Sequence, residues 1–220
     1  MPGGQTLNAW EARVLGHLGD HPSIATVLDR WNEGETAFMT TRYLSGGSLK
    51  DLIADSRKSG QWLPADEILR ISAEIVNGLA HIHRCRILYL DLQPKNVLFD
   101  QWRNIRLVDF DTAVPFDDIG GADVAHRPVT SYMAPELLEG AGVGERADLY
   151  SLGATIYEMC QGYPPPRAFS AEIQAGRRTP PQHLSTFGAT ASGSWPCQGW
   201  CNSLLGGPCP PASGRRVRWM

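Results

Sequence analysis

The most informative segment of the sequence is residues 88–98, which read Leu-Tyr-Leu-Asp-Leu-Gln-Pro-Lys-Asn-Val-Leu. Asp91 and Asn96 stand five residues apart inside it, and both carry oxygen atoms that suit a hard cation. Asp109 follows Asn96 by thirteen residues and opens the tripeptide Asp-Phe-Asp. Two further motifs follow, Ala-Pro-Glu at residues 134–136 and Asp-Leu-Tyr-Ser-Leu-Gly at residues 148–153. Each motif is weak alone, but four of them in this order and at this spacing form a specific pattern.

The order and spacing of these motifs resemble those of the eukaryotic-type protein kinase family. That family has a His-Arg-Asp catalytic loop ending in Asn, then Asp-Phe-Gly, Ala-Pro-Glu and an aspartate that opens a buried helix. The resemblance covers about residues 8–170, and Pro94 is similar to the serine/threonine branch, since the tyrosine branch usually has Ala-Ala-Arg there. It implies an α+β, protein-kinase-like fold. Residues 1–44 would form a partial N-lobe with helix C and two strands, and residues 45–170 a partial, mainly helical C-lobe.

The resemblance also assigns roles to the polar residues of these motifs. Phosphoryl transfer depends on positioning and on neutralising phosphate charge, with little covalent help from the protein. By the resemblance, Asp91 would accept or orient the proton of the substrate hydroxyl, and Asn96 and Asp109 would hold Mg²⁺. Taken singly, each of these residues could instead cap a turn. We therefore expect ATP and Mg²⁺ as cofactors, on the strength of the family resemblance.

A second set of expected contacts concerns the adenine ring of ATP. Residues 41–44, Thr-Arg-Tyr-Leu, match the segment that joins the two lobes. The backbone at Arg42 and Leu44 would contact adenine, Thr41 would be the gatekeeper, and Leu98 would form the floor beneath the ring. For the apolar side chains an ordinary core position is equally compatible with the sequence, and the two roles do not exclude each other.

The catalytic motifs depart from the family pattern at four positions. Tyr89 and Leu90 replace His and Arg, so the loop has no arginine that could bind the phosphate group of a phosphorylated activation loop. Gln93 replaces the lysine of the serine/threonine branch, which removes a cation from the transferring phosphoryl group. Asp111 replaces glycine and adds a carboxylate beside Asp109, where it would either bind a second metal ion or bias the loop toward inactivity. Candidate phosphorylation positions in the following segment are Thr112, Thr130 and Ser131.

The start of the sequence adds a further departure. In the family the Gly-rich loop and the nucleotide-binding lysine precede helix C, whereas the ten residues before Glu11 include no lysine. Glu11 occupies the position of the helix C glutamate, and without that lysine we expect it to be a solvated helix residue. The large-lobe helices after Pro166 are not recognisable, so we expect a domain that is incomplete at both ends.

Three functions are compatible with these motifs. The first is a serine/threonine-type protein kinase domain that transfers the γ-phosphoryl group of ATP to a protein hydroxyl, truncated and of uncertain activity in this chain. The alternative is a pseudokinase or kinase fragment that acts as a non-catalytic binding module. A third, a small-molecule phosphotransferase, is disfavoured because residues 134–136 and 148–153 belong to protein-substrate kinases.

Apolar periodicity predicts the elements of this fold. We expect helices over residues 6–19, 49–57, 66–84 and 146–161, and strands over residues 25–31, 36–44, 96–99 and 105–108. Asp148 begins the last helix and is expected to accept backbone hydrogen bonds from the catalytic loop. His81 and His83 lie two residues apart on a helix and cannot share a face, so a metal site there is disfavoured.

Composition restricts the partners of the chain. Its 220 residues are 42% hydrophobic and 20% charged with a net charge of −3, which is typical of a globular protein and gives no reason to expect nucleic acid or an anionic membrane. Neither a signal-peptide core nor an apolar segment of transmembrane length is present in the sequence. We expect a cytoplasmic protein whose partners are ATP and a protein substrate or docking partner.

The last part of the sequence differs from the rest. Residues 1–172 carry a net charge of −8, whereas residues 173–220 hold five arginines, no acidic residue, and three of the five cysteines. A zinc site at Cys197, Cys201 and Cys209 is disfavoured by the irregular spacing and the missing fourth ligand. We expect residues 171–220 to be a disordered or aberrant tail rather than a second domain.

Overall fold

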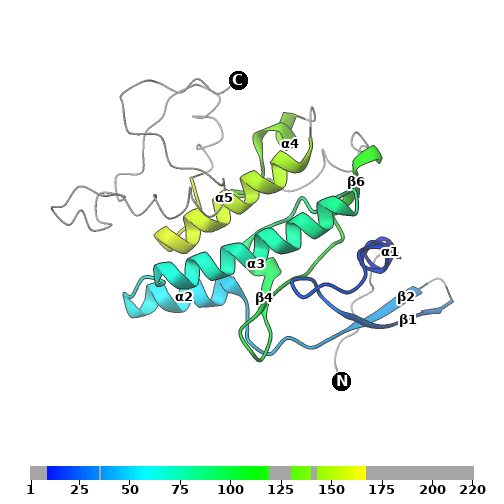
Figure 1. Cartoon of the computed structure of the whole chain (residues 1–220), viewed down its shortest axis with the longest axis horizontal. Coiled ribbons are helices and arrows are strands. Elements are labelled where there is room, and N and C mark those ends of the chain that lie inside the picture. Colours follow the sequence, from blue (N-terminus) through cyan, green and yellow to red (C-terminus); the bar gives the residue numbers. More distant parts are fainter. Residues whose placement is uncertain (1–8, 35, 119–129, 140–142, 167–220) are drawn as a thin grey trace. The chain divides into compact units, whose positions relative to one another are not determined.

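The computed structural model describes residues 9–34, 36–118, 130–139 and 143–166, all of which belong to one of the two compact units of the chain (Figure 1). The helices are α1 (Ala9–Leu18), α2 (Leu49–Ser59), α3 (Ala65–Arg84), α4 (Pro135–Glu139) and α5 (Glu145–Gln161). The strands are β1 (Val27–Glu33), β2 (Thr36–Thr41), β3 (Ile87–Leu88), β4 (Val97–Phe99), β5 (Ile105–Leu107) and β6 (Val114–Pro115). Short 3₁₀ turns cover Pro94–Asn96 and Phe116–Asp118. The mixture of helices and strands confirms the predicted α+β class.

Local sequence explains where the helices begin and end. Ser48 caps α2 in a reciprocal capping box, in which its hydroxyl accepts from the N–H of Asp51 and the Asp51 carboxylate accepts from the N–H of Ser48. Gly60 ends α2 in the left-handed conformation, which glycine adopts without steric cost. Gly162 ends α5 in the same way. These caps set the boundaries of α2 and the end of α5.

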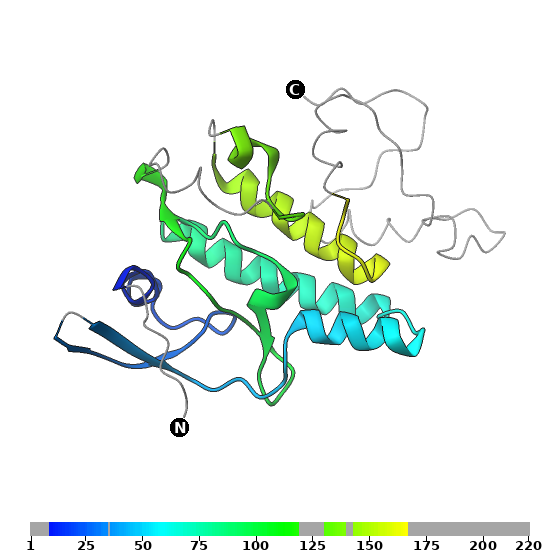
Figure 2. The same cartoon turned by 180° about the vertical axis from the view of Figure 1, so that it is seen from behind.

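The strands form three antiparallel pairs rather than one sheet. β1 pairs with β2, β3 with β6, and β4 with β5. A parallel bridge between Ile24 and Leu107 ties the segment after α1 to β5, and a bridge between Ser48 and Leu98 ties the start of α2 to β4. Figures 1 and 2 show the β1–β2 hairpin and α1 on one side of the described residues, and α2, α3 and α5 on the other.

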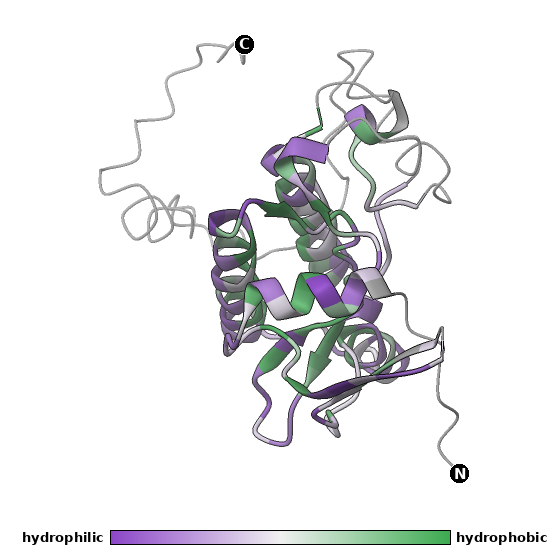
Figure 3. Cartoon of the chain, turned by 90° about the vertical axis from the view of Figure 1, so that its right-hand side faces the viewer, coloured by the Kyte–Doolittle hydropathy of each residue, from purple (hydrophilic) through white to green (hydrophobic). Residues whose placement is uncertain are grey.

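A main hydrophobic core joins most of these elements, and a second, smaller cluster around Leu88, Leu90 and Leu137 holds α4 and β6. The inner side of α3 contributes Ile68, Ile71, Ile75, Leu79 and Ile82, all of them buried. α3 packs against α5, β3 and β5, and the buried side chains of α1 (Val14, Leu15 and Leu18) belong to the same core. In Figure 3 the helical turns alternate between hydrophobic and hydrophilic colours, as expected for helices that bury only one face. The core therefore holds the strands and loops that follow α3 in fixed positions.

Most predicted elements are confirmed, with boundaries that shift by a few residues. α3 begins one residue before the prediction, and β2 ends at Thr41 rather than at residue 44. The sequence reasoning missed α4 and the pair β3–β6, which are too short to show periodicity. In the part of the chain that the structure describes, no helix has both the length and the apolar character needed to cross a membrane. The predicted tail at residues 171–220, including its three cysteines, lies outside the described residues.

Candidate functional site

The loop between β3 and β4 holds Asp91 in a network of short hydrogen bonds. The Nε2 atom of Gln93 donates to Oδ1 of Asp91 at 2.6 Å, and Nδ2 of Asn96 donates to Oδ2 at 2.6 Å. The same Asn96 amide donates to the backbone carbonyl of Asp91 at 2.9 Å. The structure therefore brings Asp91 and Asn96 together, as the motif predicts, with the carboxylate orientation fixed from both sides.

The burial of Asp91 shifts the pKa of its carboxyl group. Desolvation raises the pKa of this carboxyl group, while Lys95 and the amide donors of Asn96 and Gln93 act in the opposite direction. The Nζ atom of Lys95 lies 3.9 Å from Oδ2 of Asp91, at the limit of an ion pair, and half of its side chain is exposed. Asp91 is thus a partly buried carboxylate with one nearby cation.

Asp148 anchors the same loop from the opposite side. Its side chain is fully buried at the first turn of α5, and its two oxygens accept from the N–H groups of Tyr89 at 3.0 Å and Leu90 at 2.7 Å. The Nε2 atom of His83 lies 2.7 Å from Oδ2 of the same carboxylate. Leu90 has a φ of +61°, a left-handed conformation that the two bonds to Asp148 help to hold. The prediction that Asp148 accepts backbone bonds from the catalytic loop is confirmed.

Tyr89 links the catalytic loop to the segment that carries Asp109. Its ring is fully buried, its hydroxyl donates to the carbonyl of Val108, and its centroid lies 4.9 Å from that of Phe110. Thr112 donates from its hydroxyl to the carbonyl of Tyr89 at 3.3 Å. Where the family has a histidine, this chain therefore uses a tyrosine whose hydroxyl donates to the carbonyl of the residue directly before Asp109.

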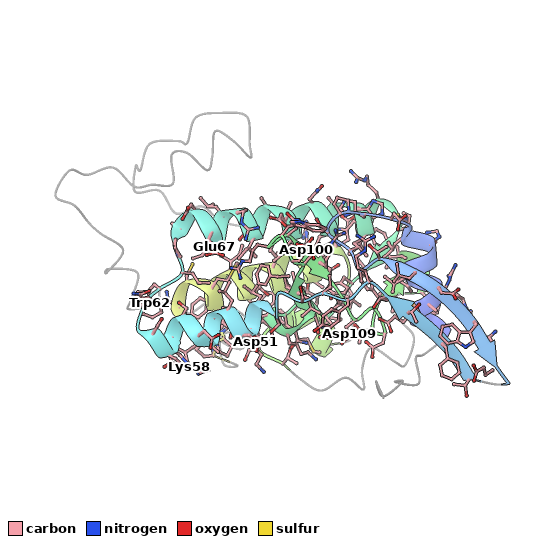
Figure 4. All side chains as sticks on the ribbon, turned by 90° about the horizontal axis from the view of Figure 1, so that it is seen from below. Asp51, Lys58, Trp62, Glu67, Asp100 and Asp109 are labelled. Carbon is pink, nitrogen blue, oxygen red and sulfur yellow. The ribbon has the colours of Figure 1, made fainter. Side chains whose placement is uncertain are left out.

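Asp109 occupies a strained and acidic environment. Its φ is +65°, in the left-handed region that only glycine and a few polar residues adopt readily. Burial, together with a hydrogen bond to Asp111 and the charges of Asp111, Asp91 and Glu11, raises the pKa of Asp109 to about 7. Figure 4 places Asp109 between the β1–β2 hairpin and the helices α2 and α3. Three carboxylates thus act on Asp109, and they come from α1 (Glu11), the catalytic loop (Asp91) and the Asp-Phe-Asp segment (Asp111).

The expectation that Glu11 is a solvated helix residue is wrong. Its side chain is buried, and its Oε1 atom accepts from the backbone N–H of Phe110 at 3.1 Å. The adjacent Trp10 donates from its indole N–H to the carbonyl of Ala113 at 2.8 Å. The partner of Glu11 is a backbone N–H in a segment far along the chain, so no local sequence pattern could reveal it. Helix α1 is therefore bonded directly to the segment that carries Asp109.

The predicted adenine contacts lie along the connection between β2 and α2. Thr41 and Arg42 are exposed and Leu44 is half-buried. The N–H of Arg42 bonds to the carbonyl of Thr26 at 2.9 Å, while the carbonyl of Arg42 and the N–H of Leu44 have no hydrogen-bond partner among the described residues. These two free backbone groups could pair with the edge of a planar heterocycle.

Gly46 joins this connection to the strand that carries Leu98. Its N–H bonds to the carbonyl of Phe99 at 2.9 Å, and a Cβ atom at this position would lie 2.6 Å from the Cβ of Phe99. Any side chain here would push β4 away from the connection, so glycine is required. The half-buried Leu98 thereby lies on the strand next to the predicted adenine-binding segment.

A second polar cluster lies between the Ala-Pro-Glu segment and α5, and the sequence reasoning missed it. The hydroxyl of Tyr132 donates to the buried carboxylate of Glu158, and the hydroxyl of Ser151 donates to the carbonyl of Tyr132 at 2.8 Å. The hydroxyl of Thr130 accepts from the N–H of Tyr132 at 3.3 Å. Of the predicted phosphorylation positions, Thr112 and Thr130 are therefore engaged in hydrogen bonds and Ser131 is half-buried.

The residues present suit a magnesium ion that is shared with phosphate. Because the Asn96 amide nitrogen donates to Asp91, the Oδ1 atom of Asn96 remains available as an oxygen ligand, and Asp109 offers a half-buried carboxylate. The described residues contain no set of three His, Cys, Asp or Glu side chains that would hold a metal ion unaided. Mg²⁺ usually takes one or two protein oxygens and completes its shell with water and substrate phosphates. The donors Asn96 and Asp109 fit that pattern.

Comparisons with known proteins agree with the motifs. The family described as protein kinase domain matches residues 5–191. Serine/threonine-protein kinase RUNKEL of Arabidopsis thaliana is 33% identical over 157 residues, which cover 70% of this chain and 11% of the relative. Serine/threonine-protein kinase Nek2 of Mus musculus is 30% identical over 176 residues, or 76% of this chain and 39% of the relative. Ribosomal protein S6 kinase beta of Caenorhabditis elegans is 34% identical over 74% of this chain and 30% of its own length, so the chain spans well under half of each relative.

Proposed function

Because the chain belongs to the serine/threonine branch of the protein kinase family, we propose that its described residues form a phosphotransfer site for ATP and a protein hydroxyl. The observation that carries the proposal is the fixed carboxylate of Asp91, held by Gln93 and Asn96 at 2.6 Å each. A positioned carboxylate whose pKa is raised by burial is suited to accept a proton near neutral pH.

In the proposed reaction the substrate hydroxyl donates its proton to Asp91 while its oxygen bonds to the γ-phosphorus of ATP and ADP leaves. Asn96 and Asp109 hold Mg²⁺, which neutralises phosphate charge when bound. The carbonyl of Arg42 and the N–H of Leu44 pair with adenine, with Thr41 beside them and Leu98 on the adjacent strand. The binding of ATP and Mg²⁺ by this chain, and a cytoplasmic location, remain parts of the proposal.

A second candidate function is non-catalytic binding of a protein partner by the same fold. Two observations favour it. The buried carboxylate of Glu11 accepts from the backbone N–H of Phe110, and none of the ion pairs among the described residues includes Glu11, whereas an active kinase pairs this glutamate with a lysine.

The two candidates are separated by an assay of phosphate transfer. The purified chain is incubated with Mg²⁺, γ-labelled ATP and casein as a generic serine/threonine substrate, beside the variant Asp91→Asn. Asparagine keeps a carbonyl acceptor for one neighbouring amide but cannot accept the proton, so a kinase loses transfer by about 100-fold or more. Labelling above the level of the variant supports the kinase.

Nucleotide binding is measured in parallel by the thermal stability of the chain with and without Mg²⁺ and ATP. Stabilisation without transfer supports the binding module. Transfer at the same level in the wild-type chain and in Asp91→Asn contradicts the role proposed for Asp91.

A further inference from the structure

The outward side of α3 carries an apolar stripe that none of the described elements covers. Its members are Leu69, Ala73, Val76 and Ala80, all of them exposed, with Leu69 at 41% and Val76 at 42%. The opposite side of the helix packs against α5, β3 and β5. In Figure 4, α3 runs along one edge of the described residues, with Glu67 marking its first turn. A helix at the surface normally presents polar residues on this side, so the stripe requires an explanation.

The spacing of the stripe is that of a seam between two helices. Successive members are separated by four, three and four residues, the alternation that keeps one side of a helix against a partner helix. The charged neighbours Glu67, Arg70 and Glu74 pair with one another, so they place no isolated charge beside the seam. At a rise of 1.5 Å per residue the four members extend over about 16 Å, which is three turns of a partner helix.

The ends of the stripe carry opposite charges. Asp66 lies one turn before Leu69 and Arg84 lies one turn after Ala80, and both side chains are exposed. Neither has an ion-pair partner among the described residues. The stripe therefore has an acidic end and a basic end of its own.

We propose that the stripe is the contact surface of a homodimer in which α3 of a second copy packs antiparallel to it. A two-fold axis that crosses the helix between Glu74 and Ile75 places Leu69 opposite the Ala80 position of the other copy, and Ala73 opposite its Val76 position. Each large side chain thus meets a small one, which permits close packing. The same axis places Asp66 within one residue of the Arg84 position at both ends of the contact, within reach of a long arginine side chain.

The charges of Asp66 and Arg84 favour a second copy of the chain as the partner and an antiparallel orientation of the two α3 helices. A parallel pair would place Asp66 against the same residue of the other copy and Arg84 likewise, and both contacts would be repulsive. In the antiparallel pair Asp66 of each copy instead lies near the Arg84 position of the other, so both contacts are attractive. The two contacts are equivalent, as in any two-fold symmetric interface. Since one helix pair buries less than the roughly 800 Å² per partner of a standard interface, the dimer is expected to be weak and to depend on protein concentration.

The proposal is tested by sedimentation equilibrium of the full chain over about a hundredfold range of concentration at low salt. The wild-type chain is expected to shift from monomer to dimer. Asp66→Arg and Arg84→Asp should each weaken association at least tenfold, because each places like charges opposite one another. The double variant Asp66→Arg with Arg84→Asp should restore association to the wild-type level.

Two controls separate this result from a change in folding or from unspecific charge effects. Val76→Glu should abolish association, whereas Lys58→Glu on α2 should leave it unchanged. All of these side chains are exposed, so the variants should retain the wild-type far-ultraviolet circular dichroism. A wild-type chain that stays monomeric throughout, or a double variant that associates no better than the single variants, overturns the proposal. Neither result bears on phosphate transfer, which is measured separately.

Discussion

Asp148 and Asp109 are carboxylates on either side of the buried aromatic pair Tyr89 and Phe110, but one is surrounded by hydrogen-bond donors and the other by carboxylates. Asp148 is fully buried and receives the N–H groups of Tyr89 and Leu90 as well as a contact from His83. Asp109 is half-buried, has a left-handed backbone, and faces the carboxylates of Asp111, Asp91 and Glu11. The difference distinguishes a carboxylate that is satisfied by hydrogen-bond donors from one that is surrounded by other carboxylates.

The comparison predicts its largest effect at Asp148. Asp148→Ala leaves two backbone N–H groups and an imidazole buried without an acceptor, and should reduce the free energy of unfolding by about 3–5 kcal/mol. Urea denaturation followed by circular dichroism measures the loss. Asp148→Asn, which keeps one carbonyl acceptor, should lose less than Asp148→Ala. Equal losses in the two variants would show that neither the side-chain volume nor a single retained acceptor matters, and that the charge of the carboxylate does.

A smaller effect is expected where α1 meets the Asp109 segment. Glu11→Ala removes the acceptor of the Phe110 N–H, and an unpaired buried donor costs about 1–3 kcal/mol of unfolding free energy. Glu11→Gln retains an acceptor for the same donor and should stay within about 1 kcal/mol of the wild-type chain. Urea denaturation of both variants separates the hydrogen bond from the charge. If Glu11→Gln is as unstable as Glu11→Ala, the bond to Phe110 is not the stabilising contact.

The third prediction concerns the pH dependence of stability. The pKa of Asp109 is raised to about 7 from the ordinary value of 3.8, so the folded chain keeps a proton that the unfolded chain has lost. This contribution to stability is present at low pH and is lost as the pH rises through the interval from 3.8 to about 7. In Asp111→Asn the hydrogen-bonded carboxylate beside Asp109 becomes an amide, and the loss should end at a lower pH. Melting temperatures measured from pH 4 to pH 8 in both chains test the shift, and superimposable profiles would contradict it.

The hydrogen bonds of Asp148 could be predicted from the sequence, whereas the surroundings of Asp109 could not. The bonds from Asp148 to the catalytic loop follow from a motif with a regular position at the start of a helix, and the periodicity of residues 66–84 is strong enough to predict α3. Glu11 was misassigned because its partner is a backbone N–H almost a hundred residues away, which no local pattern reveals. The crowding around Asp109 likewise depends on three segments that only the tertiary fold brings together. Short elements such as α4 and β6 escaped prediction because a few residues cannot display a period.

The smallest effect on stability is expected at the one cation near Asp91. Lys95 lies 3.9 Å from the Asp91 carboxylate and is half exposed, so Lys95→Ala should change the unfolding free energy by no more than about 0.5 kcal/mol. Its effect should instead appear in titration, because removing the positive charge lets the pKa of Asp91 rise further above its usual range. In a chain that transfers phosphate, the acidic limb of the pH–rate profile would then move to higher pH. Lys58→Ala removes a more exposed pair with Asp55 on α2, far along the chain from Asp91, and should leave the profile unchanged. A profile that moves in both variants would indicate a general effect of net charge, and one that moves in neither would place Lys95 outside the electrostatic environment of Asp91.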